Sequence, residues 1–311
     1  MIFDPTRSVL PEGTIREGAL PAGATREGTA REAANGERAT RERALRRRQR
    51  FEHGLLGLAA ALLFAFMAAP LVGLFTTASW PDFLAGLAHP LVWPALRLSL
   101  VTTAASLACV VLLGTPLAWL LARSERGWLR LVETVLQLPI VIPPAVADIA
   151  ILLAFEHHSL LAALYPAGWS ITFTTTAVVL AQIFVSAPFF VQAASSAFRR
   201  IDPHLILVAR SFGASPLRVL WRVALPLAAP GLWAGALLSW ARALGEFGAT
   251  LMFAGNLEGR TQTLPLAIYT ALEADLRAAQ SLSIVLVLLA LVLLVGVRTL
   301  LAAFDRVGAS R

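Results

Sequence analysis

Ionisable side chains inside long apolar runs are the residues of this sequence that could do chemistry. Arg242 and Glu246 are four apart, so one turn of helix would bring their charges together. A charged group inside a bilayer is costly unless it is paired or hydrated, so each is a candidate functional residue. Arg242 could attract a dianion, or the pair could brace the helix near Gly245 and Gly248. We favour the brace, because a carboxylate beside the route of an anion would repel it.

Two further carboxylates lie in another apolar run. Glu133 is near the start of that run, where it can reach water, and it needs no special role. Asp148 lies deeper and has no charged partner close to it in the sequence. A carboxylate is unsuited to bind an anion, so the residues assign Asp148 no function.

Prolines and neutral donors complete the set of polar or helix-breaking residues in these runs. Prolines interrupt backbone hydrogen bonds, and broken helices are tolerated in membranes where they line a cavity or pack on protein. Hydroxyl and amide groups could replace the hydration of an oxyanion, although hydroxyls often bond their own helix; the candidates are Gln182, Ser186 and Thr250. The residues predicted to line a gate or path are Pro139, Pro143, Pro144, Arg242, Glu246 and Thr250.

The sequence contains few signs of enzymatic chemistry. HExxH and CxxC motifs are missing, and the nearest approach to a metal-ligand cluster is Glu156-His157-His158 in a connection. The single cysteine, Cys109, lies in an apolar run and suits packing. The chain has no lysine, whereas a phosphate-binding loop of the form GxxxxGK[ST] requires one. We therefore expect a non-catalytic chain without metal or cofactor, whose ATP is bound by a partner; a membrane-embedded enzyme is the distant alternative.

Apolar runs long enough to cross a membrane position these residues. The 311 residues are 57% hydrophobic and only 14% charged, which is too apolar for an ordinary soluble domain. Crossing a hydrocarbon core takes about 20 residues of helix. The sequence predicts six such spans: Leu55–Thr77, Leu98–Ala122, Leu131–Phe155, Thr174–Ala194, Val223–Ala249 and Leu282–Leu301.

The arginines indicate how these spans are oriented. Most of them fall in the arm before Phe51, in the connections 123–130 and 195–222, and after Phe304, whereas the opposite connections contain only Arg97, Arg260 and Arg277. Because cytoplasmic connections are enriched in basic residues, both termini are predicted to face the cytoplasm of a cell whose inner membrane the chain crosses several times.

Composition divides the chain into three parts. Residues 1–52 form a Gly-, Thr-, Arg- and Glu-rich arm that we predict to be disordered and cytoplasmic. Its basic end, "RERALRRRQR", could bind anionic membrane lipid or simply fix the topology. Residues 53–304 are the predicted transmembrane domain, and residues 305–311 are a short cytoplasmic tail.

The segment "ARSFGASPLRVLWRVALPLAAPG" predicts a helix, a sharp turn and a second helix in the long connection 195–222. Asp202 before Pro203 is a helix start, and Gly213 suits the left-handed residue that ends a helix. Ser215 before Pro216 repeats the start signal, and the helix that follows is amphipathic up to Pro226, with Arg218 and Arg222 on one face. Such a structure could be offered to a cytoplasmic partner or could anchor the connection at the membrane surface.

The same segment resembles the permease subunits of ABC importers, whose pattern is E-A-A, three residues, G, nine residues and I-x-L-P. Ala209, Gly213, Val223, Leu225 and Pro226 stand at matching positions, whereas Leu207 and Val208 replace the acidic residue and the first alanine. The resemblance implies that this loop docks on an ATPase subunit through a coupling helix. The residues it assigns to coupling are Ala209, Gly213, Ala214, Ser215, Arg218 and Pro226.

Three further stretches are similar to the molybdate branch of these permeases. They are "LPIVIPPAV" (138–146), "ARALGEFGATLMFAGN" (241–256) and "GRTQTLPLAIYTAL" (259–272). Sulfate permeases share the "GEFG" element, so sulfate, thiosulfate or tungstate is the alternative cargo. By the same resemblance, which covers about residues 91–303, a small or apolar residue is usual where this chain has Asp148.

The resemblance implies an all-α, type I (MetI-like) ABC importer permease fold and a defined assembly. Two copies of the chain would pair with two ATP-binding cassette subunits and with a periplasmic or extracellular molybdate-binding protein, and no nucleic acid is expected. A sensor subunit that does not transport would share the same spans and loop.

Overall fold

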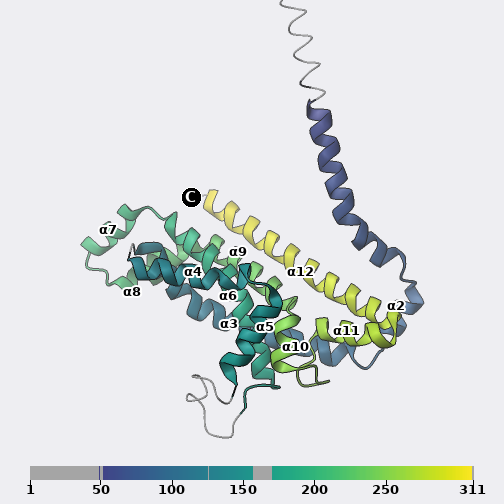
Figure 1. Ribbon diagram of the computed structural model, residues 1–311. Helices are drawn as coiled ribbons and strands as arrows, with labels where there is room; N and C mark the ends of the chain where they lie inside the picture. The colour runs from purple at the N-terminus through teal and green to yellow at the C-terminus, as the bar shows by residue number, and fades with distance from the viewer. Residues whose placement is uncertain (1–48, 50–51, 125, 157–169, 310–311) are drawn as a thin grey trace, which may run out of the picture. The chain divides into compact units, whose positions relative to one another are not determined.

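The computed structural model describes residues 52–124, 126–156 and 170–309, together with Gln49. All regular elements in these ranges are helices, which confirms the prediction of an all-α chain (Figure 1). The arm before Glu52 apart from Gln49, the pair His157-His158 and residues 310–311 lie outside the described residues, so what we expected of them stays a prediction. Residues up to Val72 form one compact unit and residues 73–311 a second.

The second unit contains the helices that carry the candidate residues. In chain order they are α2 (Trp80–Leu87), α3 (Val92–Arg123), α4 (Gly127–Val141), α5 (Pro144–Phe155), α6 (Thr175–Arg199), α7 (Pro203–Ser211), α8 (Pro216–Val219), a π-helical turn (Leu220–Ala224), α9 (Leu225–Leu244), α10 (Gly248–Ala254), α11 (Leu264–Ala274) and α12 (Leu276–Ala309). The helix Glu52–Thr76 precedes them and runs across the boundary between the two units.

Among the described residues, five helices are long and apolar enough to cross a membrane, and six if α4 and α5 count as one bent span. The first, second, fourth and sixth predicted spans coincide with Glu52–Thr76, α3, α6 and the first part of α12. The third predicted span corresponds to the bent pair α4 and α5, and the break that its prolines predicted is present. Ile142 and Pro143 separate α4 from α5, and the two helices meet at 119°.

The fifth predicted span was wrong at both ends. Its helix begins at Pro216, continues through the π-helical turn and ends at Leu244. Gly245, Glu246 and Phe247 then break the chain before α10 starts at Gly248. Gly245, which precedes Glu246, makes this break inexpensive, since glycine is a poor helix former.

Two helices were not predicted because they are too short to span a membrane. They are α2 and α11, and both pack on α12. Their apolar faces close one core with the start of α3; the buried residues there include Val92, Ala95, Leu264, Ala267 and Leu282.

The helix α6 lies at the centre of the second unit, between α3 and α9, with α4 against it (Figure 1). Small residues permit its close approach to α9. A Cβ added at Gly231 would lie 2.5 Å from the Ala197 methyl group, and one added at Gly235 would lie 2.8 Å from that of Ala193. Interfaces of small residues are typical of membrane helices, which gain little from burying apolar surface against each other.

Candidate functional site

The connection between α6 and α9 has the turn that its sequence predicts. The Asp202 carboxylate accepts a hydrogen bond from the His204 backbone N–H at 2.9 Å and so caps α7. Gly213 has a φ of 79°, the left-handed conformation that favours glycine. Ser215 caps the next helix, because its hydroxyl accepts from the Arg218 N–H at 3.4 Å. The predicted helix, turn and helix are confirmed.

The second of these helices enters the fifth span, as the sequence predicted. It does so through a π-helical turn, which was not predicted, and continues as α9. Its two faces are as expected: Val219, Leu220 and Ala224 are buried, and Arg218 and Arg222 are exposed. A movement at Gly213 would therefore act directly on a spanning helix.

The helix α7 presents apolar side chains to its surroundings. Phe212, at the end of the helix, is 85% exposed, and Leu205, Leu207 and Val208 are each about half exposed or more. None of the residues of α7 is buried. A nine-residue helix with an uncovered apolar face is a typical interaction surface, and Leu207 belongs to that face although the permease pattern has an acidic residue there.

A small cavity brings four of the six predicted gate residues together. Its volume is about 150 Å³, and it lies where the α4–α5 break meets the α9–α10 break. The predicted residues Pro139, Pro144, Arg242 and Glu246 line it, with Asp148 and five apolar residues. Pro143, the residue before α5, and Thr250, fully buried on α10, do not.

The Arg242–Glu246 ion pair exists, although the two residues do not share one helix. Arg242 Nη1 lies 2.7 Å from Glu246 Oε2, with Arg242 on the last turn of α9 and Glu246 in the break after it. The other carboxylate oxygen of Glu246 accepts from the Ala249 N–H at 2.9 Å, in the first turn of α10. Glu246 is only 4% exposed. The pair therefore holds α9 and α10 together across the break.

Asp148 adds a second carboxylate to the cavity. It is 6% exposed, and its carboxylate faces the backbone of α10 at Gly248, where an added Cβ would lie 2.6 Å from Oδ2. The cavity thus has two acidic groups and one basic group. This balance does not attract an anion, so the cavity suits a junction between helices better than a binding site for a dianion.

The neutral donors lie between helices, away from the cavities described here. Gln182 Nε2 on α6 donates to Thr102 Oγ1 on α3 at 3.2 Å. The hydroxyls of Ser186 and Thr250 are buried and have no hydrogen-bond partner in the described part of the chain. Gln182, Ser186 and Thr250 do not line the cavity at the α4–α5 break.

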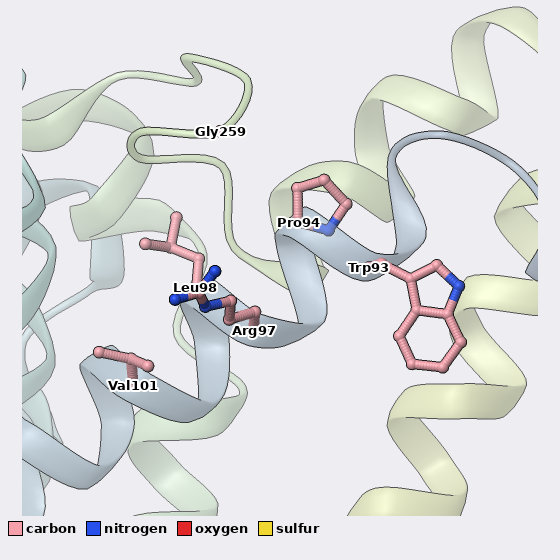
Figure 2. A pocket seen from close by; sticks show the side chains of 6 residues that line it. All are labelled: Trp93, Pro94, Arg97, Leu98, Val101 and Gly259. Atoms are coloured by element: carbon pink, nitrogen blue, oxygen red, sulfur yellow. The ribbon is translucent and has the colours of Figure 1, made fainter.

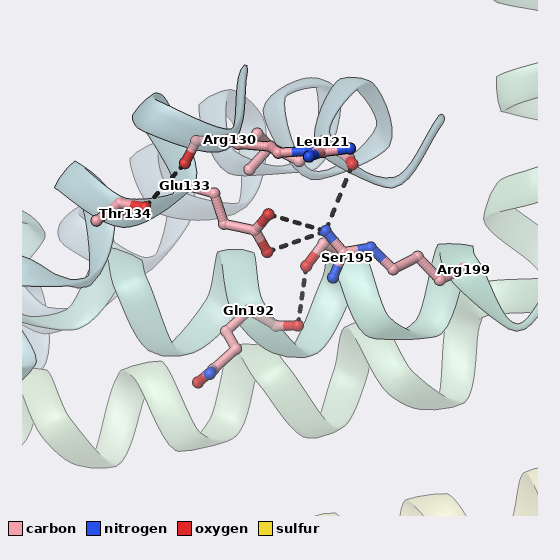
Figure 3. Close-up of polar contacts among 7 residues, drawn as sticks. All are labelled: Leu121, Arg130, Glu133, Thr134, Gln192, Ser195 and Arg199. Carbon is pink, nitrogen blue, oxygen red and sulfur yellow. Dashed lines mark hydrogen bonds and ion pairs between the residues drawn. The ribbon is translucent and has the colours of Figure 1, made fainter. Parts of the chain in front are cut away.

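Two arginine sites were not recognised from the sequence. Glu133 was expected to need only water, but both of its oxygens accept from Arg199 Nη2 on α6, at 2.9 and 3.0 Å (Figure 3). Near the first turn of α3, at the end opposite Arg123, Arg97 lines a cavity of about 520 Å³. The other lining residues are Trp93, Pro94, Leu98, Val101 and Gly259 (Figure 2). Trp93 and Arg97 are four residues apart at the start of a long apolar helix. This spacing places both side chains on one face of the helix, and it is the feature of the sequence from which the cavity could have been predicted.

Solved structures show which fold the chain has. The chain resembles a bacterial ABC transporter that imports alginate, with a TM-score of 0.66 at 18% identity over 83% of this chain and 96% of that one. It also resembles the MetNI methionine ABC transporter, with a TM-score of 0.56 at 20% identity over 68% and 95%. The fold is that of a MetI-like ABC importer permease, as the resemblance in the sequence implied.

The chain belongs to the family of binding-protein-dependent transport system inner membrane components, whose model matches residues 114–307. It is 46% identical over 233 residues to the molybdenum transport system permease protein ModB of Mycobacterium tuberculosis, covering 75% of this chain and 88% of the relative. It is 33% identical over 250 residues to the molybdate/tungstate transport system permease protein WtpB of Pyrococcus abyssi, covering 79% and 94%. The chain is therefore a multi-pass membrane protein of a transport family.

Proposed function

We propose that this chain is the membrane-spanning subunit of an ATP-driven importer of molybdate. The observation that carries the proposal is its 46% identity with the mycobacterial ModB over most of both chains. Tungstate is the second candidate cargo, because the archaeal WtpB named for both oxyanions aligns over nearly its whole length. Sulfate has only the shared "GEFG" element in its favour.

The proposed coupling surface is α7 with the turn at Gly213. Its exposed apolar residues are suited to the groove of an ATPase subunit, and Gly213 joins it to the helix that becomes α9. Shape and apolar contact would replace the ionic contact that an acidic residue at position 207 would supply. The coupling residues are those that the sequence pattern assigns: Ala209, Gly213, Ala214, Ser215, Arg218 and Pro226.

The arginine distribution supports an orientation with α7 and both termini in the cytoplasm. The proposed assembly has two copies of this chain, two ATPase subunits and an external binding protein that delivers the oxyanion. The alginate importer structure includes a complex with its periplasmic protein, which supports an arrangement of this kind. The arm, the transmembrane domain and the tail retain the proposed bounds 1–52, 53–304 and 305–311.

The cavity around Asp148, Arg242 and Glu246 is proposed to act as a gate hinge. Residues that line it come from the bent pair α4 and α5 and from the end of α9, the helix that continues from the turn at Gly213. Pro139, Pro143 and Pro144 would permit the change of angle at this junction, and Thr250 would follow with α10.

Uptake in reconstituted vesicles tests the proposal. The chain would be co-purified with a candidate ATPase and supplied with a candidate binding protein from the same organism, and uptake of molybdate, tungstate and sulfate would be measured with and without ATP. ATP-dependent molybdate uptake is expected, with competition by tungstate and little by sulfate. Uptake of sulfate alone would contradict the cargo, and failure to bind any ATPase would contradict the function.

A further inference from the structure

A cavity lined by arginines lies at one end of three spanning helices. Its volume is about 460 Å³, and it is bounded by the last turn of α3, the start of α4 and the end of α6. The charged residues lining it are Arg123, Arg130, Arg199 and Glu133. Three basic groups thus face one acidic group, so basic groups are in excess here, whereas acidic groups are in excess in the cavity around Asp148, Arg242 and Glu246.

One of the three arginines is already neutralised. Arg199 Nη2 donates to both oxygens of Glu133 and reaches the Leu121 carbonyl at 3.5 Å (Figure 3). This pair fixes α4 against α6 and leaves the positive charges of Arg123 and Arg130 without a carboxylate partner among the described residues. Glu125, in the same connection, lies outside those residues.

Arg123 is held in place by groups that do not cancel its charge. Its Nη2 donates to the carbonyls of Phe198 and Ile201, at 3.1 and 3.2 Å, and its guanidinium lies 5.1 Å from the ring centre of Trp119. Its Nε is buried and has no hydrogen-bond partner within the described part of the chain. A buried N–H without a partner is costly, and this one adds to the positive character of the cavity wall without being open to a ligand.

The start of α4 adds further positive potential. Leu129 and Arg130 of its first turn line the cavity, and no side chain caps the helix at Arg126. The backbone N–H groups of these two residues already donate to the Arg126 carbonyl, at 3.0 and 3.4 Å, so the start of α4 contributes through its helix dipole, which favours an anion. Arg130 is exposed, so its guanidinium is free to turn toward a ligand.

We propose that this cavity binds a phosphate group. Two uncancelled guanidinium groups beside a helix start match a tetrahedral oxyanion, which guanidinium binds through paired hydrogen bonds. The group could come from an anionic phospholipid headgroup, since α3 crosses the membrane and ends at Arg123, or from free inorganic phosphate. The inference rests on the proposed function only for placing this end of α3 at headgroup level, and it needs neither ATPase nor cargo.

The test measures phosphate binding by the full-length chain alone in nanodiscs. In one arm the discs contain phosphatidylcholine with phosphatidylglycerol, and native mass spectrometry reports the phosphatidylglycerol retained by each chain. In the other arm the discs contain phosphatidylcholine only, and calorimetry reports binding of inorganic phosphate. The variants are Arg130→Ala, Glu133→Gln and the matched control Arg126→Ala, an exposed arginine of the same connection that does not line the cavity.

The two cavity variants are expected to act in opposite directions. Arg130→Ala should lower binding about fivefold, Glu133→Gln should raise it by a similar factor because it frees Arg199, and Arg126→Ala should change little. This pattern in the first arm assigns a lipid headgroup, and in the second it assigns free phosphate. No binding in either arm, or equal losses in Arg126→Ala and Arg130→Ala, would overturn the proposal. If the unsubstituted chain binds phosphate but supports no molybdate uptake, the result counts against the proposed function and leaves the phosphate site standing.

Discussion

The carboxylate of Asp148 lies so close to Gly248 that an added Cβ there would be 2.6 Å from Asp148 Oδ2 and 3.3 Å from its Cγ. This contact joins α5 to the first residue of α10, so each of the two broken regions supports the other. A side chain at position 248 would have to displace a buried carboxylate. The glycine and the aspartate are therefore one structural unit.

Gly248→Ala is expected to destabilise the chain by about 1–3 kcal/mol, because the overpacked site cannot relax without moving Asp148. Thermal unfolding of the purified chain in nanodiscs measures the loss. Asp148→Gly combined with Gly248→Ala should recover most of it. The control is Gly245→Ala, whose added Cβ would meet only the Ala241 carbonyl at 3.7 Å. Equal losses at positions 245 and 248 would contradict the role of the contact.

Arg242→Gln is expected to destabilise the chain by about 2 kcal/mol, because it leaves the buried Glu246 carboxylate without its cation beside Asp148. Asp148→Asn alone keeps the shape of the side chain and removes the excess negative charge, so it should be nearly neutral. In the double variant Asp148→Asn should reduce the cost of losing Arg242. Additive effects in the double-mutant cycle, measured by thermal unfolding, would show that Asp148 is not coupled to the Arg242–Glu246 pair.

Local signals explain the parts of the structure that the sequence predicted well. Capping by Asp202 and Ser215 and the left-handed Gly213 depend on neighbours within three residues, so they can be read from a short segment. The prolines near position 143 located the break between α4 and α5, but the angle between these helices depends on what packs around them.

Contacts between distant residues could not be predicted in this way. Asp148 contacts Gly248, which lies a hundred residues further along the chain, and Glu133 on α4 pairs with Arg199 on α6. The Arg242–Glu246 pair was predicted from its spacing, yet the break at Gly245 was missed. Gly245 and Gly248 are local signs of a weak helix, but glycine is also common inside membrane helices, so these residues alone do not decide whether the span ends there or continues to Ala249.

Replacement of Phe212 tests the proposed docking face of α7. Phe212→Asp is expected to weaken association with the ATPase at least tenfold, because a charge would enter an apolar contact, while the thermal stability of the chain alone stays the same. Leu207→Glu, which restores the acidic residue of the permease pattern, should be tolerated. Pull-down with the ATPase measures both variants. The matched control is Trp80→Asp on α2, an exposed aromatic residue outside the α6–α9 connection.

The turn at Gly213 permits a test that separates folding from coupling. Adopting the φ of 79° found here costs a residue with a side chain about 1–2 kcal/mol, and it costs a β-branched residue more. The surroundings are open, because an added Cβ would have no described heavy atom within 4 Å outside its chain neighbours. Gly213→Val should therefore distort the backbone between α7 and α8 without a clash. ATP hydrolysis is expected to persist while molybdate uptake falls at least tenfold. Gly213→Asn is the matched control, because asparagine tolerates the left-handed conformation, and it should retain most of the uptake. Equal uptake in the valine variant and the wild type would mean that the turn does not transmit the movement of the ATPase to α9.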